Sequence, residues 1–222
     1  MSFEKRYPSF ANREGRAQFI ADSFTEEIAE AKTILDVGCD FNTLKKIVGA
    51  KVVGVDLYGA PDIVIDFEKD RLSHFRGGQF DMVVCTEVLE HLDNLHAMVQ
   101  ELHRVSSRYI LVSLPNCLNV FAKWNILFHG KVNKYYGLPF ERPDDRHRWF
   151  FSYKDIDRFF INFCKTTSCR VRRKFLQVGL SAGWRGRLVR FFVELFNINN
   201  AAQSYWILLE KPQRLTARGK KR

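Results

Sequence analysis

Residues 33–40 read Thr33-Ile34-Leu35-Asp36-Val37-Gly38-Cys39-Asp40, and this stretch decides the fold because it is typical of a buried strand that breaks at a glycine. Similar apolar runs recur along the chain and alternate with helical patterns, the clearest over residues 95–105. Such alternation predicts right-handed crossovers and a mostly parallel sheet covered on both faces. The other strands are expected at 51–55, 62–66, 80–85, 109–114, 171–178 and 204–210, and the other helices at 12–31, 44–48, 153–163 and 185–196.

The composition fits one globular domain. The chain has 222 residues, 46% of them hydrophobic and 27% charged, which is long enough to bury a core and excludes a largely disordered chain. No apolar run reaches the roughly 18 residues of a transmembrane helix, and residues 1–6 lack the apolar core of a secretory signal. Five cysteines without metal-site spacing are expected to be reduced. We therefore expect a cytoplasmic protein.

The positive charge is concentrated in the last quarter of the chain. Residues 170–222 hold 13 Lys and Arg against 2 Asp and Glu, whereas residues 1–169 hold 22 against 23. This excess suggests an anionic partner such as a membrane surface, a nucleic acid or a phosphorylated glycan; the alternative is a solvated face with a disordered tail. We expect a single domain over residues 1–212 and a basic disordered tail over 213–222, with a peripheral position at the inner membrane surface as one consequence.

Acidic side chains follow the predicted strands, at the place where open α/β sheets bind ligands. Gly38, just after Asp36, lets the backbone approach a ligand because it has no Cβ. Asp56 lies twenty residues after Asp36, at the end of the next strand, where a carboxylate can accept hydrogen bonds from both hydroxyls of a ribose. No G-x-G-x-x-G follows the first strand, which disfavours an NAD-binding domain. Two further strands end at Asp66-Phe67 and at Thr86-Glu87-Val88-Leu89-Glu90-His91-Leu92.

This ordered set resembles the class I S-adenosylmethionine (SAM)-dependent methyltransferases, many of which carry an E-V-L-E-H-L signature. The resemblance covers residues 15–115 well and the rest by layout. It implies an α/β, Rossmann-like fold of seven strands, mostly parallel with the last strand antiparallel, and helices on both faces. It also implies SAM as cofactor, with binding residues Asp36, Gly38, Cys39, Asp40, Asp56, Leu57, Asp66, Phe67 and Thr86.

One departure from the family concerns the turn after the first strand, where glycines are usual and this chain has Asp40 and Asn42. Asp and Asn tolerate left-handed backbone better than other non-glycine residues, so we expect the turn to survive. Asp40 also adds a negative charge near a cofactor that carries ammonium and sulfonium groups. We expect weaker but retained SAM binding, and a degenerate methyltransferase that serves as an interaction module is the alternative.

Candidate catalytic residues come from two segments. Glu87-x-x-Glu90-His91 places two carboxylates and an imidazole at one strand-to-helix junction, and His147 opens a segment His-Arg-Trp-Phe-Phe-Ser. Both segments resemble parts of ubiquinone-type O-methyltransferases and small-RNA 2′-O-methyltransferases, which implies Glu87, Glu90, His91 and His147 as ligands of a divalent metal such as Mg²⁺, Mn²⁺ or Zn²⁺. The alternative is that the motif caps a helix and packs beside the cofactor. Without metal, His147 or His91 could act as the base, and Glu87 completes the catalytic set.

Two stretches are expected to govern the acceptor. Residues 116–151 are rich in aromatic residues, Pro and Gly and would cover it. Residues 183–197 form a basic helix with a broad apolar face, which includes Arg185, Arg187 and Arg190. Such a face either lies on a membrane surface or packs on its own sheet, and packing is the interpretation that we favour. The apolar residues of this helix are Trp184, Leu188, Phe191, Phe192, Leu195 and Phe196.

Three functions follow from these patterns. The first is SAM-dependent O-methylation of a small-molecule or lipid-linked acceptor, such as a quinone, phenol or glycan. The second is RNA 2′-O-methylation, which the basic C-terminus and the Glu/His set favour, although no recognised RNA-binding module is present. The third is the degenerate module. The oligomeric state stays open.

Overall fold

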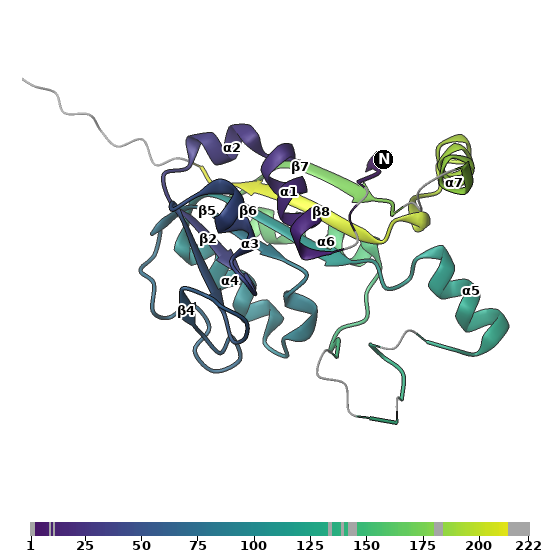
Figure 1. The fold of residues 1–222 in the computed structure, drawn as a ribbon, viewed down its shortest axis with the longest axis horizontal. Helices are drawn as coiled ribbons and strands as arrows, with labels where there is room; N and C mark the ends of the chain where they lie inside the picture. Colours follow the sequence, from purple (N-terminus) through teal and green to yellow (C-terminus); the bar gives the residue numbers. More distant parts are fainter. Residues whose placement is uncertain are drawn as a thin grey trace, which may run out of the picture.

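The computed structural model describes residues 3–8, 10, 12–132, 135–138, 140–141, 146–179 and 184–212, and the predicted tail over 213–222 lies outside them. Within these residues the strands form one eight-stranded sheet with the order β1-β7-β8-β6-β5-β2-β3-β4 (Figure 1). The strands are β1 Glu4–Arg6, β2 Ile34–Val37, β3 Val52–Asp56, β4 Ile63–Val64, β5 Phe80–Thr86, β6 Ser106–Pro115, β7 Arg170–Gln177 and β8 Ser204–Glu210.

The strand directions confirm the predicted layout. β8 lies between β6 and β7 and is antiparallel to both, whereas the other described pairs are parallel. The sequence did not predict β1, which pairs with β7 and places Glu4 opposite Phe175. The predicted strand over 62–66 is reduced to the two residues of β4 at the edge of the sheet, and the Asp62 carboxylate before it accepts a hydrogen bond from the backbone N–H of Gly54 at 2.9 Å.

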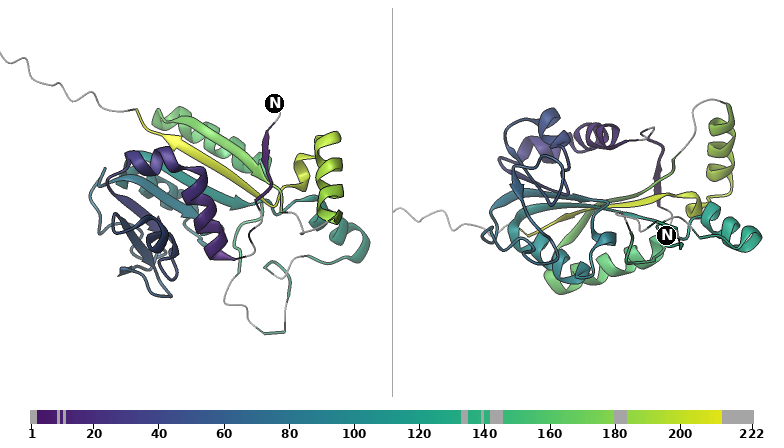
Figure 2. Two further views of the ribbon diagram at one scale, coloured as in Figure 1. Left: turned by 45° about the horizontal axis from the view of Figure 1, so that its top comes forward. Right: turned by 60° about the horizontal axis from the view of Figure 1, so that its bottom comes forward.

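Helices cover both faces of the sheet (Figure 2), as predicted. α1 and α3 pack on one face, and α4 and α6 on the other. Side chains along β6 alternate between the two faces. Tyr109 and Leu111 pack in the core under α1 and α3, and Ile110 and Val112 pack in the core under α4 and α6. The helices are α1 Arg13–Ser23, α2 Thr25–Glu30, α3 Thr43–Val48, α4 Leu95–Val105, α5 Val120–His129, α6 Tyr153–Thr167 and α7 Trp184–Leu195, with short 3₁₀ turns η1 Leu89–His91 and η2 Asn199–Ala201.

The single helix expected over residues 12–31 is two helices that meet at Phe24. The backbone of Phe24, with φ −124° and ψ 35°, leaves the helical range. Its ring is fully buried and stacks on Phe175 of β7, with 6.4 Å between ring centroids. Burial of the ring therefore overrides the helical periodicity. α1 itself begins at Asn12, whose side chain accepts a hydrogen bond from the backbone N–H of Gly15 at 2.9 Å.

Two helices, α5 and α7, stand apart from the layers at one end of the molecule (Figures 1 and 2). α5 was not predicted and lies inside the 116–151 segment, whereas α7 lies between β7 and β8, where a basic helix was expected. The favoured interpretation of α7, that its apolar face packs on the sheet, is wrong. Apart from Val193, its large apolar side chains are exposed. Over the described part of the chain, no helix has both the length and the apolar character needed to cross a membrane.

Candidate functional site

Three residues of the turn after β2 have left-handed backbone, as predicted from the sequence. Gly38, Asp40 and Asn42 have φ values of 80°, 52° and 55°. The backbone N–H of Asp40 donates to Asp56 Oδ2 at 2.8 Å, and Asn42 Nδ2 donates to the carbonyl of Ala60 at 2.8 Å. The expectation that Asp40 and Asn42 preserve the turn is therefore confirmed. Both residues also tie it to the loop after β3.

Gly38 is the residue of this turn that has no room for a side chain. A Cβ built on it would lie 2.2 Å from Cγ2 of Val88, well inside van der Waals contact. Val88 sits between β5 and η1 and packs against the main core. The close approach of the β2 turn to the E-V-L-E-H-L segment thus depends on a glycine at position 38.

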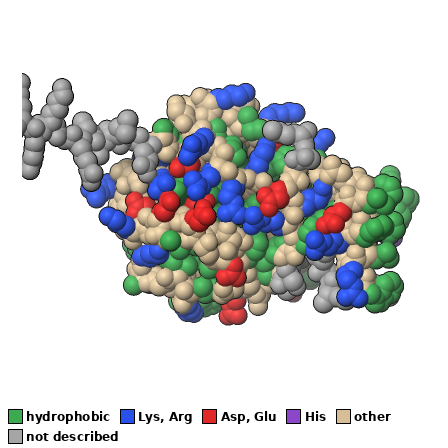
Figure 3. All heavy atoms as spheres, turned by 90° about the horizontal axis from the view of Figure 1, so that it is seen from above, with side chains coloured by type: hydrophobic (Ala, Val, Ile, Leu, Met, Phe, Trp, Pro, Cys, Tyr) green, Lys and Arg blue, Asp and Glu red, His purple; other side chains and the backbone are tan. Residues whose placement is uncertain are grey.

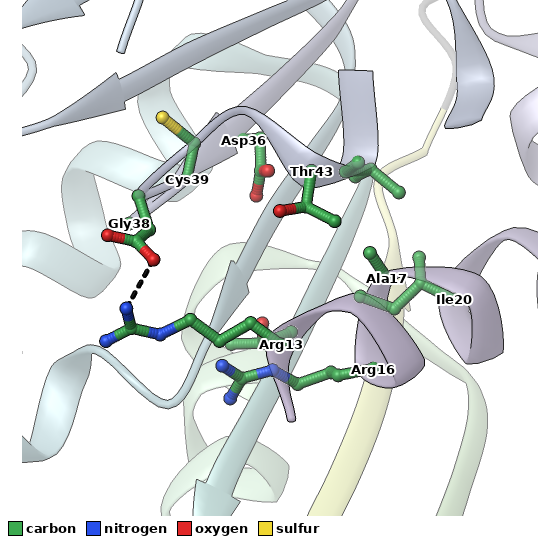
Figure 4. A pocket seen from close by; sticks show the side chains of 11 residues that line it. Arg13, Arg16, Ala17, Ile20, Asp36, Gly38, Cys39 and Thr43 are labelled. Carbon is green, nitrogen blue, oxygen red and sulfur yellow. Dashed lines mark hydrogen bonds and ion pairs between the residues drawn. The ribbon is translucent and has the colours of Figure 1, made fainter. Parts of the chain in front are cut away.

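A small cavity opens between this turn and α1 (Figure 4). The side chains of Arg13 and Arg16 extend across it from α1, and Arg13 forms an ion pair with Asp40 (dashed line in Figure 4). The cavity measures about 30 Å³, far below the several hundred Å³ of usual small-molecule sites. Five of the predicted cofactor residues line it: Asp36, Gly38, Cys39, Asp40 and Thr86.

Asp36 is the buried acid of this cavity. Burial is the main cause that raises the pKa of its carboxyl to about 7, and the nearby Asp56 carboxylate adds to the rise, whereas the guanidinium of Arg16 opposes it. A cationic ligand in the cavity would favour the ionised form, since it would replace the lost solvation. Beside Arg13 and Arg16, the cavity therefore offers Asp36 as an acidic partner for a cationic group of a ligand.

The other four predicted cofactor residues line neither of the two cavities described here. Asp56 accepts backbone hydrogen bonds, from Asp40 and from Leu57 at 2.7 Å, and Leu57 itself is exposed. The side chain of Asp66 accepts from the N–H of Glu68 and pairs with Lys69 at 2.9 Å, which lowers the pKa of its carboxyl. Phe67 is buried in the core. Their roles toward a cofactor stay predictions.

A second cavity, of about 520 Å³, lies beyond the carboxyl ends of β5 and β6. Arg13 and Arg16 line it as well as the small cavity, so the two share a wall. The three predicted catalytic residues, Glu87, His91 and His147, also line it. Its remaining walls come from Glu90, from the 116–151 segment (Asn116, Cys117, Asn119, Ala122, Tyr135 and Tyr136) and from Pro115, Gln203 and Ser204.

Hydrogen bonds to backbone carbonyls hold Arg148 and Trp149, just after His147, against residues of η1 and its end that lie 57 or more residues earlier in the chain. The N–H of Arg148 donates to the carbonyl of Glu90 at 2.8 Å, and its Nε donates to the carbonyl of His91 at 3.0 Å. The indole of Trp149 donates to the carbonyl of Leu92 at 2.6 Å. These bonds bring the two predicted catalytic segments together and explain the basic and aromatic residues that follow His147.

The tautomer of His147 follows from its contact with Tyr136. The Tyr136 hydroxyl lies 2.9 Å from Nδ1 of His147, 2.7 Å from Sγ of Cys117 and 2.8 Å from the carbonyl of Trp149. A carbonyl only accepts, so the single phenolic hydrogen goes to Trp149 and Nδ1 of His147 must donate to the phenolic oxygen. The lone pair of a neutral His147 is then on Nε2. Burial raises the pKa of Tyr136, which keeps the hydroxyl protonated in this network.

Three of the four predicted metal ligands come together. Glu90, His91 and His147 each offer a ligand atom, and these atoms all lie within 4.8 Å of one another. One carboxylate and two imidazoles are a donor set that suits Zn²⁺ or Mn²⁺, so the residues fit a divalent metal. Glu87 is not part of this group. Its side chain accepts from the Ser113 hydroxyl at 3.0 Å, and burial raises its pKa.

Sequence reasoning missed the arginines of α1. Arg13 and Arg16 lie one helical turn apart, which places both side chains on one face of the helix. That spacing is visible in the sequence, but it becomes informative only when α1 is known to pass the carboxyl end of β2. Gln203 and Ser204 were missed for a similar reason, because the antiparallel entry of β8 brings its first residue to this edge.

Comparisons with known proteins agree with this geometry. A family profile described as methyltransferase domain matches residues 10–163. A ubiquinone biosynthesis O-methyltransferase from Pseudomonas paraeruginosa is 31% identical over 91 residues, which are 33% of this chain and 39% of that protein. The chain thus matches about two fifths of the length of this curated relative.

Solved structures share the fold at low sequence identity. A SAM-dependent methyltransferase from Archaeoglobus fulgidus superposes with a TM-score of 0.57 at 16% identity, covering 90% of this chain and 95% of the other. The small RNA methyltransferase HEN1 gives a TM-score of 0.55 at 15% identity, covering 95% of this chain and 27% of the other. Together with the matched family profile, these findings show that the chain belongs to the methyltransferase domain family, within the class I SAM-dependent methyltransferases.

Proposed function

We propose that the protein transfers a methyl group from SAM to a hydroxyl oxygen of a small-molecule or lipid-linked acceptor, such as a quinone, phenol or glycan. The observation that carries this proposal is the 520 Å³ cavity, which holds His147, His91 and Glu87 and shares Arg13 and Arg16 with the cofactor-side cavity. Its volume suits a small molecule. The similarity to a ubiquinone biosynthesis O-methyltransferase supports a hydroxyl acceptor.

SAM supplies an electrophilic methyl group on a sulfonium when it is bound. The small cavity is too small for such a molecule, so its entry requires Arg13 to separate from Asp40. Arg13 and Arg16 would then attract the carboxylate of the cofactor, and the buried Asp36 would attract its ammonium group. Asp40 competes for Arg13, which gives a physical reason for weakened but retained binding.

His147 is the proposed base. With its Nδ1 proton held by Tyr136, its Nε2 can accept the proton of an acceptor hydroxyl as that oxygen attacks the methyl carbon. Much of the rate comes from holding oxygen and methyl in line, which the walls of the second cavity would do. The products are the methyl ether and S-adenosylhomocysteine (SAH).

A divalent metal is the second part of the proposal. Glu90, His91 and His147 would hold it, because their ligand atoms lie together and one carboxylate with two imidazoles is a donor set that divalent metals accept. Such a metal would lower the pKa of a hydroxyl bound to it. His147 then serves as a ligand rather than a base, so the metal and the metal-free schemes exclude each other at this residue.

RNA 2′-O-methylation is the alternative reaction. The Glu90, His91 and His147 group favours it, as does the similarity in fold to a small RNA methyltransferase. The small size of the cofactor-side cavity instead favours the degenerate interaction module. Failure of SAM and SAH to bind in a calorimetric titration would support that module and exclude both reactions.

The test is a SAM-consumption screen with quinol, sugar and RNA acceptors, each with and without EDTA. We expect turnover of the quinol or sugar class, loss of most turnover in His147→Ala, and unchanged turnover in the matched control His74→Ala, whose side chain is exposed and lines neither cavity. Inhibition by EDTA that added Mn²⁺ or Zn²⁺ reverses would support the metal scheme. Full turnover by His147→Ala would remove this residue from both schemes.

A further inference from the structure

The surface of α5 is unusually apolar for a helix in which the structure describes no buried residue. Leu127 is 76% exposed, and Trp124 and Phe128 are 57% and 58% exposed, with their rings in contact at 4.1 Å. A helix in water normally buries such side chains on a neighbouring element. Their exposure therefore indicates that this helix is built to contact something outside the chain.

α7 and the residue after it repeat the pattern. Trp184, Leu195 and Phe196 are each 60% or more exposed, and Phe191 and Phe192, which lie between Trp184 and Leu195 on the chain, are 57% and 45% exposed. Only Val193 of its large apolar residues is buried, so one side anchors the helix while the rest of its apolar surface faces outward.

Both helices lie at the same end of the molecule, which Figures 1 and 2 show from three directions. α5 contacts η2, the turn that joins α7 to β8. The space-filling view shows apolar side chains gathered at this end with Lys and Arg side chains beside them (Figure 3). The start of α5 also reaches the large cavity, since Asn119 and Ala122 line it. The apolar surface therefore adjoins the proposed acceptor site.

The charges of this region are positive. Residues 117–140 hold three lysines and no acidic residue, and residues 183–198 hold three arginines and one glutamate. Lys123 and Lys131 are exposed beside the apolar side chains of α5, and Arg187 is exposed on α7. Glu194, the one acid, is neutralised by Arg190 at 2.9 Å. The surface thus combines exposed aromatic and aliphatic side chains with exposed basic side chains, among them Lys123, Lys131 and Arg187.

We propose that α5 and α7 dock the protein on the surface of an anionic lipid bilayer. Tryptophan and phenylalanine side chains partition into the boundary between headgroups and acyl chains, and lysine and arginine side chains attract anionic headgroups. This inference does not depend on the methyl-transfer reaction, and it places the mouth of the acceptor cavity at the membrane.

The test measures co-sedimentation of the full chain with vesicles of phosphatidylcholine alone and of phosphatidylcholine with phosphatidylglycerol. We expect binding to the anionic vesicles and about tenfold or greater weakening by Lys123→Glu combined with Arg187→Glu. The charge-matched control is Lys154→Glu with Lys165→Glu. Both residues are exposed on α6, which covers one face of the sheet, so this variant should bind like the wild type. Circular dichroism checks that each variant folds.

A second pair of variants tests the apolar contribution. Leu127→Ser on α5 should weaken vesicle binding severalfold, and Val64→Ser, which removes a 67% exposed side chain from β4 at the opposite edge of the sheet, should not. The fluorescence of Trp124 should shift to shorter wavelength on binding, and Trp124→Phe should remove that part of the shift.

Three results would overturn the proposal. One is failure of the wild type to sediment with anionic vesicles. Another is equal binding by the α5 and α7 variants and by their controls. The third is a concentration-dependent dimer in sedimentation experiments that Leu127→Ser abolishes, since the apolar surface would then be covered by a second copy of the chain. SAM binding by the same samples is measured without vesicles. This measurement distinguishes a failure of membrane docking from a failure of the proposed reaction.

Discussion

Replacing Gly38 by alanine should destabilise the protein through two separable effects. The first is conformational: the φ of 80° at this position is left-handed, where a residue with a Cβ costs about 1–2 kcal/mol. The second is steric, because the new Cβ would lie 2.2 Å from Cγ2 of Val88. Overpacking of this kind typically costs about 1–3 kcal/mol.

The sum is a loss of about 2–5 kcal/mol from a stability that is typically about 5–15 kcal/mol, so the variant should still fold. Gly130→Ala is the matched control. Gly130 also has a left-handed φ, 62°, but nothing lies within 4 Å of its added Cβ. It should therefore show the conformational cost alone, about 1–2 kcal/mol.

Urea unfolding of four proteins measures these terms: wild type, Gly38→Ala, Val88→Ala and the double variant. Removing the Val88 methyl groups relieves the clash, so the double variant should be more stable than the two single changes predict by about 1–3 kcal/mol. SAM affinity should fall in Gly38→Ala, because the turn that lines the cofactor-side cavity is displaced. Equal stability of Gly38→Ala and Gly130→Ala, with no coupling to Val88, would refute the reasoning.

Four further predictions concern residues that line the two cavities. Because the pKa of Asp36 is raised to about 7, its carboxyl ionises between pH 6 and pH 8, and SAM affinity should increase about tenfold over this range. The pH dependence should be lost in Asp36→Asn, and a flat profile for the wild type would contradict the prediction. In the folded protein Asp36 keeps its proton up to about pH 7, whereas in the unfolded chain it loses the proton near pH 3.8. The free energy of unfolding of the ligand-free protein should therefore fall as pH rises from about 4 to 7. Urea unfolding midpoints measured across this range test the prediction. Tyr136→Phe removes the acceptor for the Nδ1 proton of His147 and should lower kcat about tenfold to a hundredfold with little change in KM for SAM. Equal changes in kcat and KM would indicate that Tyr136 has a merely structural role. Asp40→Asn keeps a residue that tolerates left-handed backbone but releases Arg13, and SAH affinity by calorimetry should rise about twofold to fivefold; a fall would show that Asp40 contributes to binding.

The strands could be predicted from the sequence because their apolar residues are contiguous and end at Gly38, Asp56 and similar breaks. β1 could not, since its three residues, Glu-Lys-Arg, carry no apolar pattern and their strand conformation depends on pairing with β7, more than 160 residues later. The break at Phe24 has the same cause, a contact with a distant strand. α5 lacks the one-sided apolar pattern by which helices are recognised, because no side of it is buried.

The site divides in the same way. The acids and glycine at strand ends were predictable, because strand ends are visible in the sequence and ligands of open sheets bind there. The grouping of Glu90 and His91 with His147 was predicted only from resemblance, and the bonds from Arg148 and Trp149 to η1 now supply the physical reason for it. Arg13 and Arg16 belong to no recognisable motif. Their position between the two cavities could therefore be found only from the way α1 packs in the structure.

A calorimetric titration of SAH into the full chain at pH 8, repeated with Asp36→Asn and with Gly38→Ala, tests most directly whether the carboxyl end of β2 is the cofactor site. One SAH should bind per chain with saturable heat, and both substitutions should weaken it at least tenfold while the control Gly130→Ala leaves it unchanged. Absence of binding by the wild type, or binding to which Asp36 and Gly38 make no difference, would contradict a cofactor site at this turn.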